Sequence, residues 1–345
     1  MSKEQIKTGE SPFVRVPSCG GELIVRGWDE PTMRVKGEDE IVEDEKGYTI
    51  TAGGNLTLYL PAGAILSVGE VSGDLVVKQL EGAAAYDNVR GDVVLVNVGD
   101  SEIGYVRGDL SARKSSGFLS VGEIVGDVAA RGIDSATFKT IHGDIAVRHL
   151  AGDLTIYTTH GDTDLRHIAG NVTIEQSYRD VNLTSIGGEV NVRRATGDIR
   201  LRGGLSEGDH CLEAQGDVIV RWPEGEPLNL TVTARRINNR LSLNDQVEEN
   251  GTLTGRIGKG GVNLSVTSAG RAIIKPAAMT DEKWGNYEGD MEFDFEVEMA
   301  GIAARVEAEV NNHLSRISDE MGTRFGPDFG QRLAEMFSRK TDKTV

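Results

Sequence analysis

The amino-acid sequence predicts a mainly β protein: a single-stranded β-solenoid of about 18 residues per coil with a nine-residue half-repeat, an N-terminal β cap and a C-terminal helical tail. Three observations lead to this class. Glycine–acid pairs recur at constant spacing, stretches of alternating apolar residues follow them, and 44 of the 345 residues are glycine against only 8 prolines. Glycine at about twice the usual ~7%, without enriched proline, indicates many tight corners rather than a collagen-like or disordered chain.

The N-terminal part of the chain is expected to lead into the coils. Residues 1–12 are polar and are expected to be flexible, and residues 13–60 are expected to form a β-rich cap. The acidic run from Glu38 to Gly47 is expected to be a turn within this cap. The strand-like pieces of the cap are Phe13–Val16, Glu22–Trp28, Met33–Lys36, Tyr48–Thr51 and Leu56–Leu60.

Residues 61–276 carry the repeat. Glycine–acid pairs begin 17 or 18 residues apart with weaker copies midway, and the nine-residue period is plain from Gly143 onward. A sandwich or a barrel can also be built from evenly spaced strands, but constant spacing favours a solenoid, because each coil must return to the same lateral position. The copies begin at Gly73, Gly91, Gly108, Gly126 and Gly143, midway at Gly82, Gly99, Gly117 and near Asp134, and then at Gly152, Gly161, Gly170, Arg179, Gly188, Gly197 and Gly216.

Short strands are expected between these corners. The residues two and four positions after each repeat start are nearly all aliphatic, and the residues between them are mostly polar, which is typical of a strand with one buried face. We expect the glycine to provide backbone freedom for the turn and the aspartate to bond to nearby amides. The pairs are Leu75/Val77, Val93/Leu95, Leu110/Ala112, Val128/Ala130, Ile145/Val147, Leu154/Ile156, Thr163/Leu165, Val172/Ile174, Val181/Leu183, Val190/Val192, Ile199/Leu201 and Val218/Val220.

The last part of the chain has a different pattern. Residues 277–300 are expected to form an acidic β segment, because Met291 to Met299 alternates apolar and acidic residues. Residues 301–345 are expected to form an amphipathic helical tail with a second short helix after Pro327. The tail is expected to cap the last coil, to pair two chains, or, less readily given its acidic residues, to lie on a membrane surface. The oligomerisation candidates are Ile302, Val306, Val310, Leu314, Ile317 and Met321.

The segment from Leu58 to Leu95, LYLPAGAILSVGEVSGDLVVKQLEGAAAYDNVRGDVVL, resembles the bacterial "putative adhesin" family of β-solenoid domains of unknown function. That family shows a leucine-proline-x-glycine step followed by SGD-type repeats. The stretch from Gly20 to Asp39 is similar to its opening strands and the stretch from Arg256 to Lys275 to its closing coils, so the resemblance covers residues 13–276. It implies a β-solenoid, often associated with the cell envelope, that has no established enzymatic role.

Stacking at this period is expected to place an acidic ladder along one edge. Carboxylates suit divalent cations, so a calcium-binding solenoid that uses stacked turn aspartates is the alternative function. The sequence lacks the doubled glycines of GGxGxD calcium turns, which favours a structural ladder instead. The expected ladder is Asp74, Asp92, Asp109, Asp127, Asp144, Asp162, Asp180 and Asp198, and Asp153, Asn171 and Glu189 follow the opposite edge.

Two pairs of histidines are 18 residues apart and are expected to stack on neighbouring coils. The pairs are His142 with His160 and His149 with His167, the second pair with Arg148 and Arg166 beside it. Imidazole and carboxylate ligands together suit a transition metal, although a solvated histidine ladder is the simpler interpretation. The residues considered for metal binding are Asp144, Asp162, Asp180, Asp198, His142 and His160.

Composition excludes several function classes. The formal net charge of −17 argues against nucleic acid and against anionic membrane surfaces as main partners. We find no nucleophile–base pair, phosphate loop or zinc spacing, so we expect no enzyme and, calcium apart, no cofactor. The two cysteines do not make a disulfide framework.

The targeting signals are equally sparse. The N-terminal sequence is polar and charged, VPSCGG around Cys19 lacks the apolar run of a lipoprotein signal, and no apolar stretch reaches membrane-spanning length. The expected compartment is therefore the cytoplasm, with envelope association through a partner as the exception. We expect a non-enzymatic structural or interaction module that presents a long regular surface to a protein partner, or that self-associates through the C-terminal helix.

Overall fold

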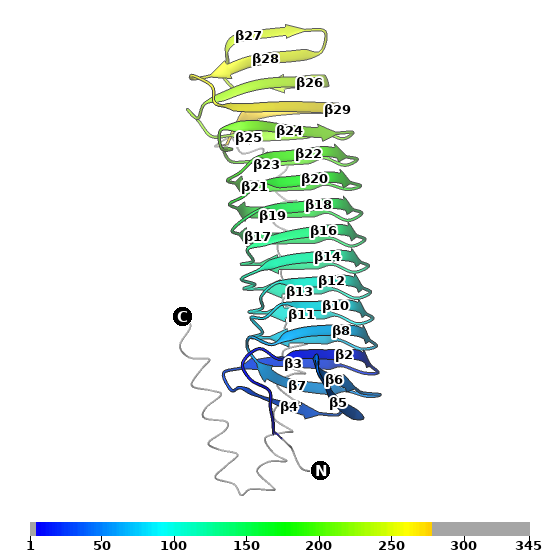
Figure 1. Ribbon diagram of the computed structural model, residues 1–345. Helices are drawn as coiled ribbons and strands as arrows, with labels where there is room; N and C mark the ends of the chain where they lie inside the picture. The colour runs from blue at the N-terminus through cyan, green and yellow to red at the C-terminus, as the bar shows by residue number, and fades with distance from the viewer. Residues whose placement is uncertain (1–4, 278–345) are drawn as a thin grey trace, which may run out of the picture. The chain divides into compact units, whose positions relative to one another are not determined.

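The structure is a computed structural model that describes residues 5–277, and the regular secondary structure of these residues consists of β-strands, numbered β1 to β29 (Figure 1). The mainly β class expected from the sequence is confirmed. Within the same residues, no helix is long and apolar enough to cross a membrane. The predicted helical tail at 301–345, and all but the first residue of the predicted acidic β segment at 277–300, lie outside the described residues.

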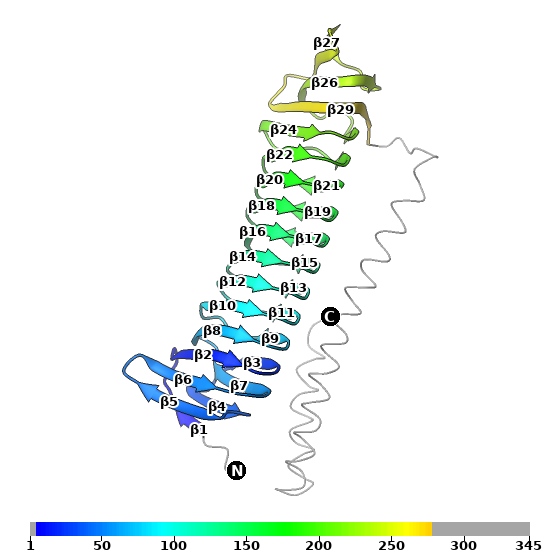
Figure 2. The same cartoon turned by 90° about the vertical axis from the view of Figure 1, so that its right-hand side faces the viewer.

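Each coil of the stack consists of two strands, and successive coils pair in parallel to build two ladders (Figure 2). Val93 lies opposite Leu110 and Leu110 opposite Val128, so equivalent residues in these coils are 17 or 18 positions apart, as expected. The even-numbered ladder comprises β8 (Ile65–Val71), β10 (Ala84–Val89), β12 (Ser101–Val106), β14 (Phe118–Ile124), β16 (Ser135–Ile141), β18 (Leu154–Thr159), β20 (Val172–Ser177), β22 (Val190–Ala195) and β24 (Gly208–Ala214). The odd-numbered ladder comprises β9 (Leu75–Lys78), β11 (Val93–Val96), β13 (Leu110–Arg113), β15 (Val128–Arg131), β17 (Ile145–Leu150), β19 (Thr163–Ile168), β21 (Val181–Ile186), β23 (Ile199–Arg202) and β25 (Val218–Trp222).

The core of the stack is filled by three residues from each half-coil. In the half-coil that begins at Gly143 these are Ile145, Val147 and Leu150, each at most 1% exposed. The sequence pattern identified the first two, at positions two and four. The third, at position seven, follows a bend that turns two consecutive side chains outward and so interrupts the alternation. Burying each such aliphatic side chain contributes about 1.5–3 kcal/mol, and the repetition of this contribution holds the stack together.

The N-terminal end of the stack begins earlier than the sequence indicated. β2 pairs in parallel with β8 and β3 with β9, so a first coil lies inside the segment 13–60 that was expected to be a separate cap. β6 and β7 extend both ladders in parallel, and β5, β4 and β1 add antiparallel strands. The bounds are β1 (Gln5–Lys7), β2 (Phe13–Cys19), β3 (Leu23–Trp28), β4 (Thr32–Lys36), β5 (Glu40–Asp44), β6 (Gly47–Thr51) and β7 (Leu56–Pro61).

Two local expectations change at this end. Part of the N-terminus expected to be flexible forms β1, which pairs with β4. Half of the run expected to be a turn, from Glu38 to Gly47, forms β5, and Asp44 accepts the backbone N–H groups of the tight turn that follows it. Ile41 explains this difference, because it packs against the core and gives an otherwise acidic strand one apolar contact.

The C-terminal end is closed by strands that leave the stack and return. The long strand β29 pairs in parallel with both β24 and β25, and so completes a further coil. β26 pairs with the other edge of β29, and β28 and then β27 add antiparallel strands beyond it. The predicted closing segment, from Arg256 to Lys275, therefore spans the end of β28 and most of β29. The bounds are β26 (Leu228–Asn239), β27 (Asn244–Glu249), β28 (Thr252–Ile257) and β29 (Val262–Pro276).

Candidate functional site

The outer surface of the stack is organised in columns, a column being the set of residues that occupy equivalent positions on successive coils. The predicted acidic ladder is one such column, and backbone hydrogen bonds build it. Oδ1 of Asp109 accepts the backbone N–H of Asp127 at 2.8 Å, and the contact repeats along the column with N···O distances of 2.7–3.2 Å. These carboxylates tie each coil to the next.

The glycine that precedes each aspartate has a different role from the one expected. A Cβ placed on Gly126 would lie 2.6 Å from the carbonyl oxygen of Gly108 and would also collide with Oδ1 of Asp109. The φ angles of these glycines are outside the left-handed region, so close approach between coils, rather than backbone freedom, excludes a side chain. Arg179 is an exception in this column. At its rung the Asp180 N to Asp162 Oδ1 distance lengthens to 3.2 Å, while the other rungs measure 2.7–2.9 Å.

Two rungs of the acidic column differ in electrostatics. Burial raises the pKa of Asp162, and the neighbouring carboxylates of Asp144 and Asp180 raise it further. Burial also acts to raise the pKa of Asp217, but side-chain and backbone hydrogen bonds from Arg271 outweigh it, and the net pKa is below its usual value. The same column therefore contains a carboxyl whose ionised form is disfavoured in its middle and one whose ionised form is favoured at its end.

The opposite edge repeats the arrangement in the positions predicted for it. Asp153 Oδ1 accepts the backbone N–H of Asn171 at 2.7 Å, and Asn171 Oδ1 accepts that of Glu189 at 2.8 Å. An amide oxygen serves here as well as a carboxylate oxygen does. The contact therefore requires an acceptor and not a negative charge.

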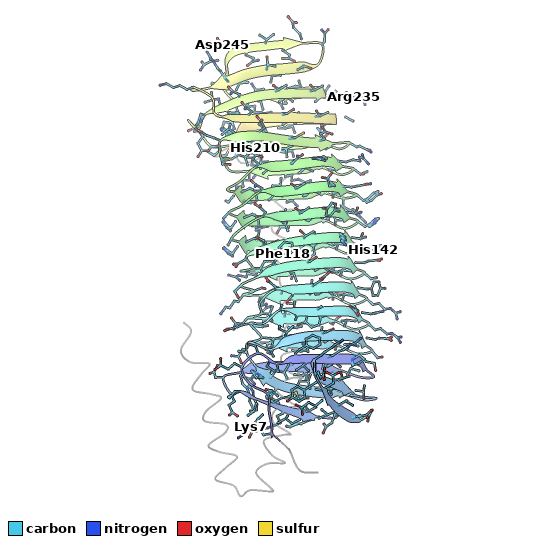
Figure 3. All side chains as sticks on the ribbon, in the orientation of Figure 1. Lys7, Phe118, His142, His210, Arg235 and Asp245 are labelled. Atoms are coloured by element: carbon cyan, nitrogen blue, oxygen red, sulfur yellow. The ribbon has the colours of Figure 1, made fainter. Side chains whose placement is uncertain are left out.

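The histidine pairs stack as the spacing predicted. The rings of His142 and His160 are parallel with centroids 5.1 Å apart, and Tyr178 continues the stack at 4.6 Å. His142, at the outer edge of the stack in Figure 3, also contacts Glu123 through Nε2 at 2.9 Å. His149 and His167 stack at 5.0 Å on the odd-numbered side. Within residues 5–277, no three His, Cys, Asp or Glu side chains come together in a way that could hold a metal ion.

A left-handed corner is a feature that the sequence analysis missed. In the coils from β8–β9 to β22–β23, the residue six positions after the repeat glycine has a positive φ, and at Lys114 this φ is 54°. Its N–H donates to the carbonyl of the next coil, as Lys114 does to Arg131 at 3.0 Å. Polar residues at this position are the available sequence signal. The column consists of Gln79, Asn97, Lys114, Gly132, His149, His167, Ser185 and Gly203.

A column of cations, here called the cationic column, lies directly beside the left-handed corner and was also missed as a whole. Its members are five positions after the repeat glycine, and Arg113 pairs in register with Arg131 and Arg131 with Arg148. Two of its rungs, Val96 and Thr184, are uncharged. The charged members are Arg26, Lys78, Arg113, Arg131, Arg148, Arg166, Arg202, Arg221 and Lys275.

The oligomerisation candidates lie outside the described residues, so their prediction stands without a structural counterpart. They are Ile302, Val306, Val310, Leu314, Ile317 and Met321.

Among solved structures, a "putative cell adhesion protein" from Clostridium sporogenes is similar, with 11% sequence identity over 80% of this chain and 96% of that chain, and with a TM-score of 0.16. No curated protein matches the chain significantly.

The sequence also matches a protein family, and the match extends from residue 20 to residue 269. It spans the coils from β3 to β29 and well over half of the chain. The resemblance to a family of uncharacterised domains is confirmed. Residues 20–269 correspond to the family described as Toastrack DUF4097, and the chain belongs to that family.

Proposed function

We propose that this chain is a non-enzymatic, adhesin-like interaction module that binds a protein partner through the regular sides of its coil stack. The carrying observation is the arrangement of outward side chains in register. The sides repeat one chemical group at a constant interval over many coils, as the cationic column does. Repetition of this kind suits an extended partner, because each coil adds one equivalent contact.

The character of the two end strands favours the sides of the stack, and not its ends, as the binding surface. β5 and β27 are the outermost strands of one ladder at opposite ends, and each is largely exposed and acidic. Asp245 lies at the C-terminal end in Figure 3. Charged edge strands of this kind discourage strand pairing with a second chain, so stacking end to end is disfavoured.

The chemistry of the acidic column supports a structural rather than a calcium-binding role. Its Oδ1 atoms are engaged by backbone amides, and toward the C-terminal end its Oδ2 atoms contact arginines as well. Arg200 bridges Asp180 and Asp198 in this way, at 2.8 and 3.2 Å. Calcium binding remains the alternative that the sequence suggests, and it predicts that calcium raises the melting temperature by mass action.

Site-specific photo-crosslinking in the producing cell tests the proposal. A photoreactive amino acid is placed singly at Phe118 or Tyr157 on the even-numbered side, at Lys114 on the odd-numbered side, or at the end positions Val42 and Val247. Phe118, Tyr157, Val42 and Val247 have matched exposures of 46–50%. We expect adducts with a partner from side positions. Adducts confined to Val42 and Val247, or absent from all five positions, would contradict it.

The same chain is melted with calcium and with chelator. A melting temperature indifferent to calcium supports the structural interpretation of the acidic column. A large rise with calcium would replace the proposed function by the alternative.

A further inference from the structure

The cationic column concentrates positive charge on a chain of the opposite net charge. Nine of the 37 lysines and arginines occupy one column, while the whole chain carries a net charge of −17. Neighbouring like charges repel, so a row of this length is costly unless anionic groups lie along it. Asp164 supplies such a group to Arg148 and Arg166, and the exposed Arg113 and Arg131 are the rungs that an anionic partner can reach most readily.

The middle of the column is accessible to such a partner. Arg113 and Arg131 are exposed on adjacent coils, and Lys114 is exposed at the neighbouring corner position. The next two rungs, Arg148 and Arg166, are partly exposed and share Asp164, with N···O distances of 3.7 and 3.0 Å. Four consecutive rungs are thus arginines, whose planar guanidinium groups bind carboxylates through paired hydrogen bonds.

The spacing of the rungs selects the shape of the partner. Adjacent coils are separated by about 4.8 Å, so successive arginines recur at that interval along the stack. An extended peptide presents side chains on one face only every ~6.7 Å, so its mismatch is about 1.9 Å per rung and nearly 6 Å over three intervals. An α-helix presents the i, i+3 and i+4 positions of one face at about 5.4 Å per turn. The helical turn and the coil spacing differ by about 0.6 Å per rung. Over three intervals the difference adds up to about 2 Å, which is within the reach of a flexible arginine side chain.

We infer that the cationic column docks an acidic α-helix of a partner protein, laid along the stack axis with a Glu or Asp on each turn of one face. This inference rests on the proposed function and names the chemistry of its partner. A helix that is acidic on one face fits a single cationic stripe, whereas a polymer charged all round, such as a sulfated polysaccharide, also meets the acidic remainder of the surface.

Fluorescence anisotropy on the full-length chain tests the inference with three probes. The first is a labelled alanine-based helical peptide with glutamates at every third or fourth position. The second has the same composition with its glutamates distributed around the helix, and the third is heparin. We expect the first peptide to bind most tightly and to weaken as salt is added.

Two double variants with equal charge change locate the binding. R113E/R131E alters the cationic column, and R107E/R194E alters exposed arginines elsewhere on the stack. The first is expected to raise the Kd of the helical peptide about tenfold, and the second to leave it within about twofold. Circular dichroism and melting temperature establish that both variants are folded.

Three outcomes would overturn the inference: no binding of the helical peptide, equal loss in both variants, or binding of the redistributed peptide or heparin as tight as that of the helix. The crosslinking experiment separates this failure from that of the proposed function. Adducts from Phe118 or Tyr157 but none from Lys114 would leave a side-binding module without a helix on the cationic column.

Discussion

Two corners of the same coil are shaped by different constraints. At the acidic corner, a glycine lies so close to the preceding coil that a Cβ on Gly126 would stand 2.6 Å from the carbonyl oxygen of Gly108. At the left-handed corner, the nearest atom to a Cβ on Gly132 would be Lys114 N, at 3.9 Å, but φ is 65°. Space limits the first corner, and backbone conformation limits the second.

The difference explains what each corner tolerates. A clash with backbone atoms excludes nearly every side chain, so glycine recurs and the repeat is visible. A left-handed φ costs an L-residue about 1–2 kcal/mol, which glutamine, asparagine, lysine, histidine and serine all accept here. The acidic corner can therefore be predicted from a single sequence by its recurring glycine, whereas the left-handed corner cannot, because many residue types occupy it.

The largest expected effect comes from filling the acidic corner. Gly126→Ala places a Cβ against two fixed atoms of the preceding coil, so the coils must separate, and we expect a loss of about 3 kcal/mol in the free energy of unfolding. Urea denaturation, monitored by circular dichroism, measures this free energy.

Gly132→Asn is the matched control at the left-handed corner. Asparagine adopts positive φ readily and already occupies this column at position 97 with a φ of 54°. We expect a loss below about 1 kcal/mol. Equal losses of unfolding free energy in Gly126→Ala and Gly132→Asn would contradict the assignment of steric exclusion to the acidic corner and of backbone conformation to the left-handed corner.

A smaller effect is expected from the acceptor at the acidic corner. Asp109→Ala removes the oxygen that receives the Asp127 N–H at 2.8 Å and leaves that amide without its partner, for a loss of about 2 kcal/mol. Asp109→Asn keeps an acceptor and removes only the charge, and we expect it to lose less than about 1 kcal/mol. Melting curves of the wild type and both variants with and without calcium distinguish a backbone acceptor from a cation ligand, since a ligand role would make the rise with calcium smaller in the asparagine variant than in the wild type.

The sequence allowed the coil length and most of the core to be predicted because glycine and alternating aliphatic residues are required wherever coils touch. The third inward position escaped notice, since the bend before Leu150 places two outward residues in succession. The sequence also did not predict that both ladders begin at β2 and β3. β2 and β3 lack the glycine–aspartate spacing of the later coils, and their pairing with β8 and β9 depends on contacts distant in sequence.

The surface columns were only partly predictable. The acidic ladder and the histidine stacks follow directly from residues 18 apart. The cationic column also has a periodic signal, a lysine or arginine five positions after the repeat glycine, but Val96 and Thr184 interrupt it. Strand pairing is what places Arg113, Arg131 and Arg148 next to one another on successive coils, so the structure and not the spacing alone defines the column.

The core on the two sides of the acidic corner at Gly161 contains a matched pair of threonines, one at the end of β18 and one at the start of β19. Both Thr159 and Thr163 are fully buried, but Thr159 donates to the carbonyl of Gly161 at 3.3 Å while Oγ1 of Thr163 has no hydrogen-bond partner. Thr163→Val removes an unsatisfied hydroxyl at nearly constant volume, and we expect a gain of about 1 kcal/mol. Thr159→Val removes a satisfied one and is expected to give no gain. A calorimetric melting temperature that rises equally for both variants would contradict the assignment.

The smallest effects compare two rungs of the acidic column, and they have opposite signs. Asp162 has a raised pKa in the folded state, so its ionised form destabilises the fold at neutral pH, and this cost disappears as pH falls through the folded pKa. Asp217 has a lowered pKa, so it stabilises the fold above its unfolded pKa, and the contribution is lost as pH falls through the folded value.

Asparagine keeps the Oδ1 acceptor at either position. Asp162→Asn should therefore raise the melting temperature at pH 7, and Asp217→Asn should lower it. Both differences from the wild type should shrink in acid: for Asp162→Asn as pH falls through the raised folded pKa, and for Asp217→Asn as pH falls below the unfolded pKa toward the lowered folded one. Melting temperatures from pH 7 to pH 3 check this, and shifts of the same sign at pH 7 would show that Arg271 does not set the end of the column apart from its middle.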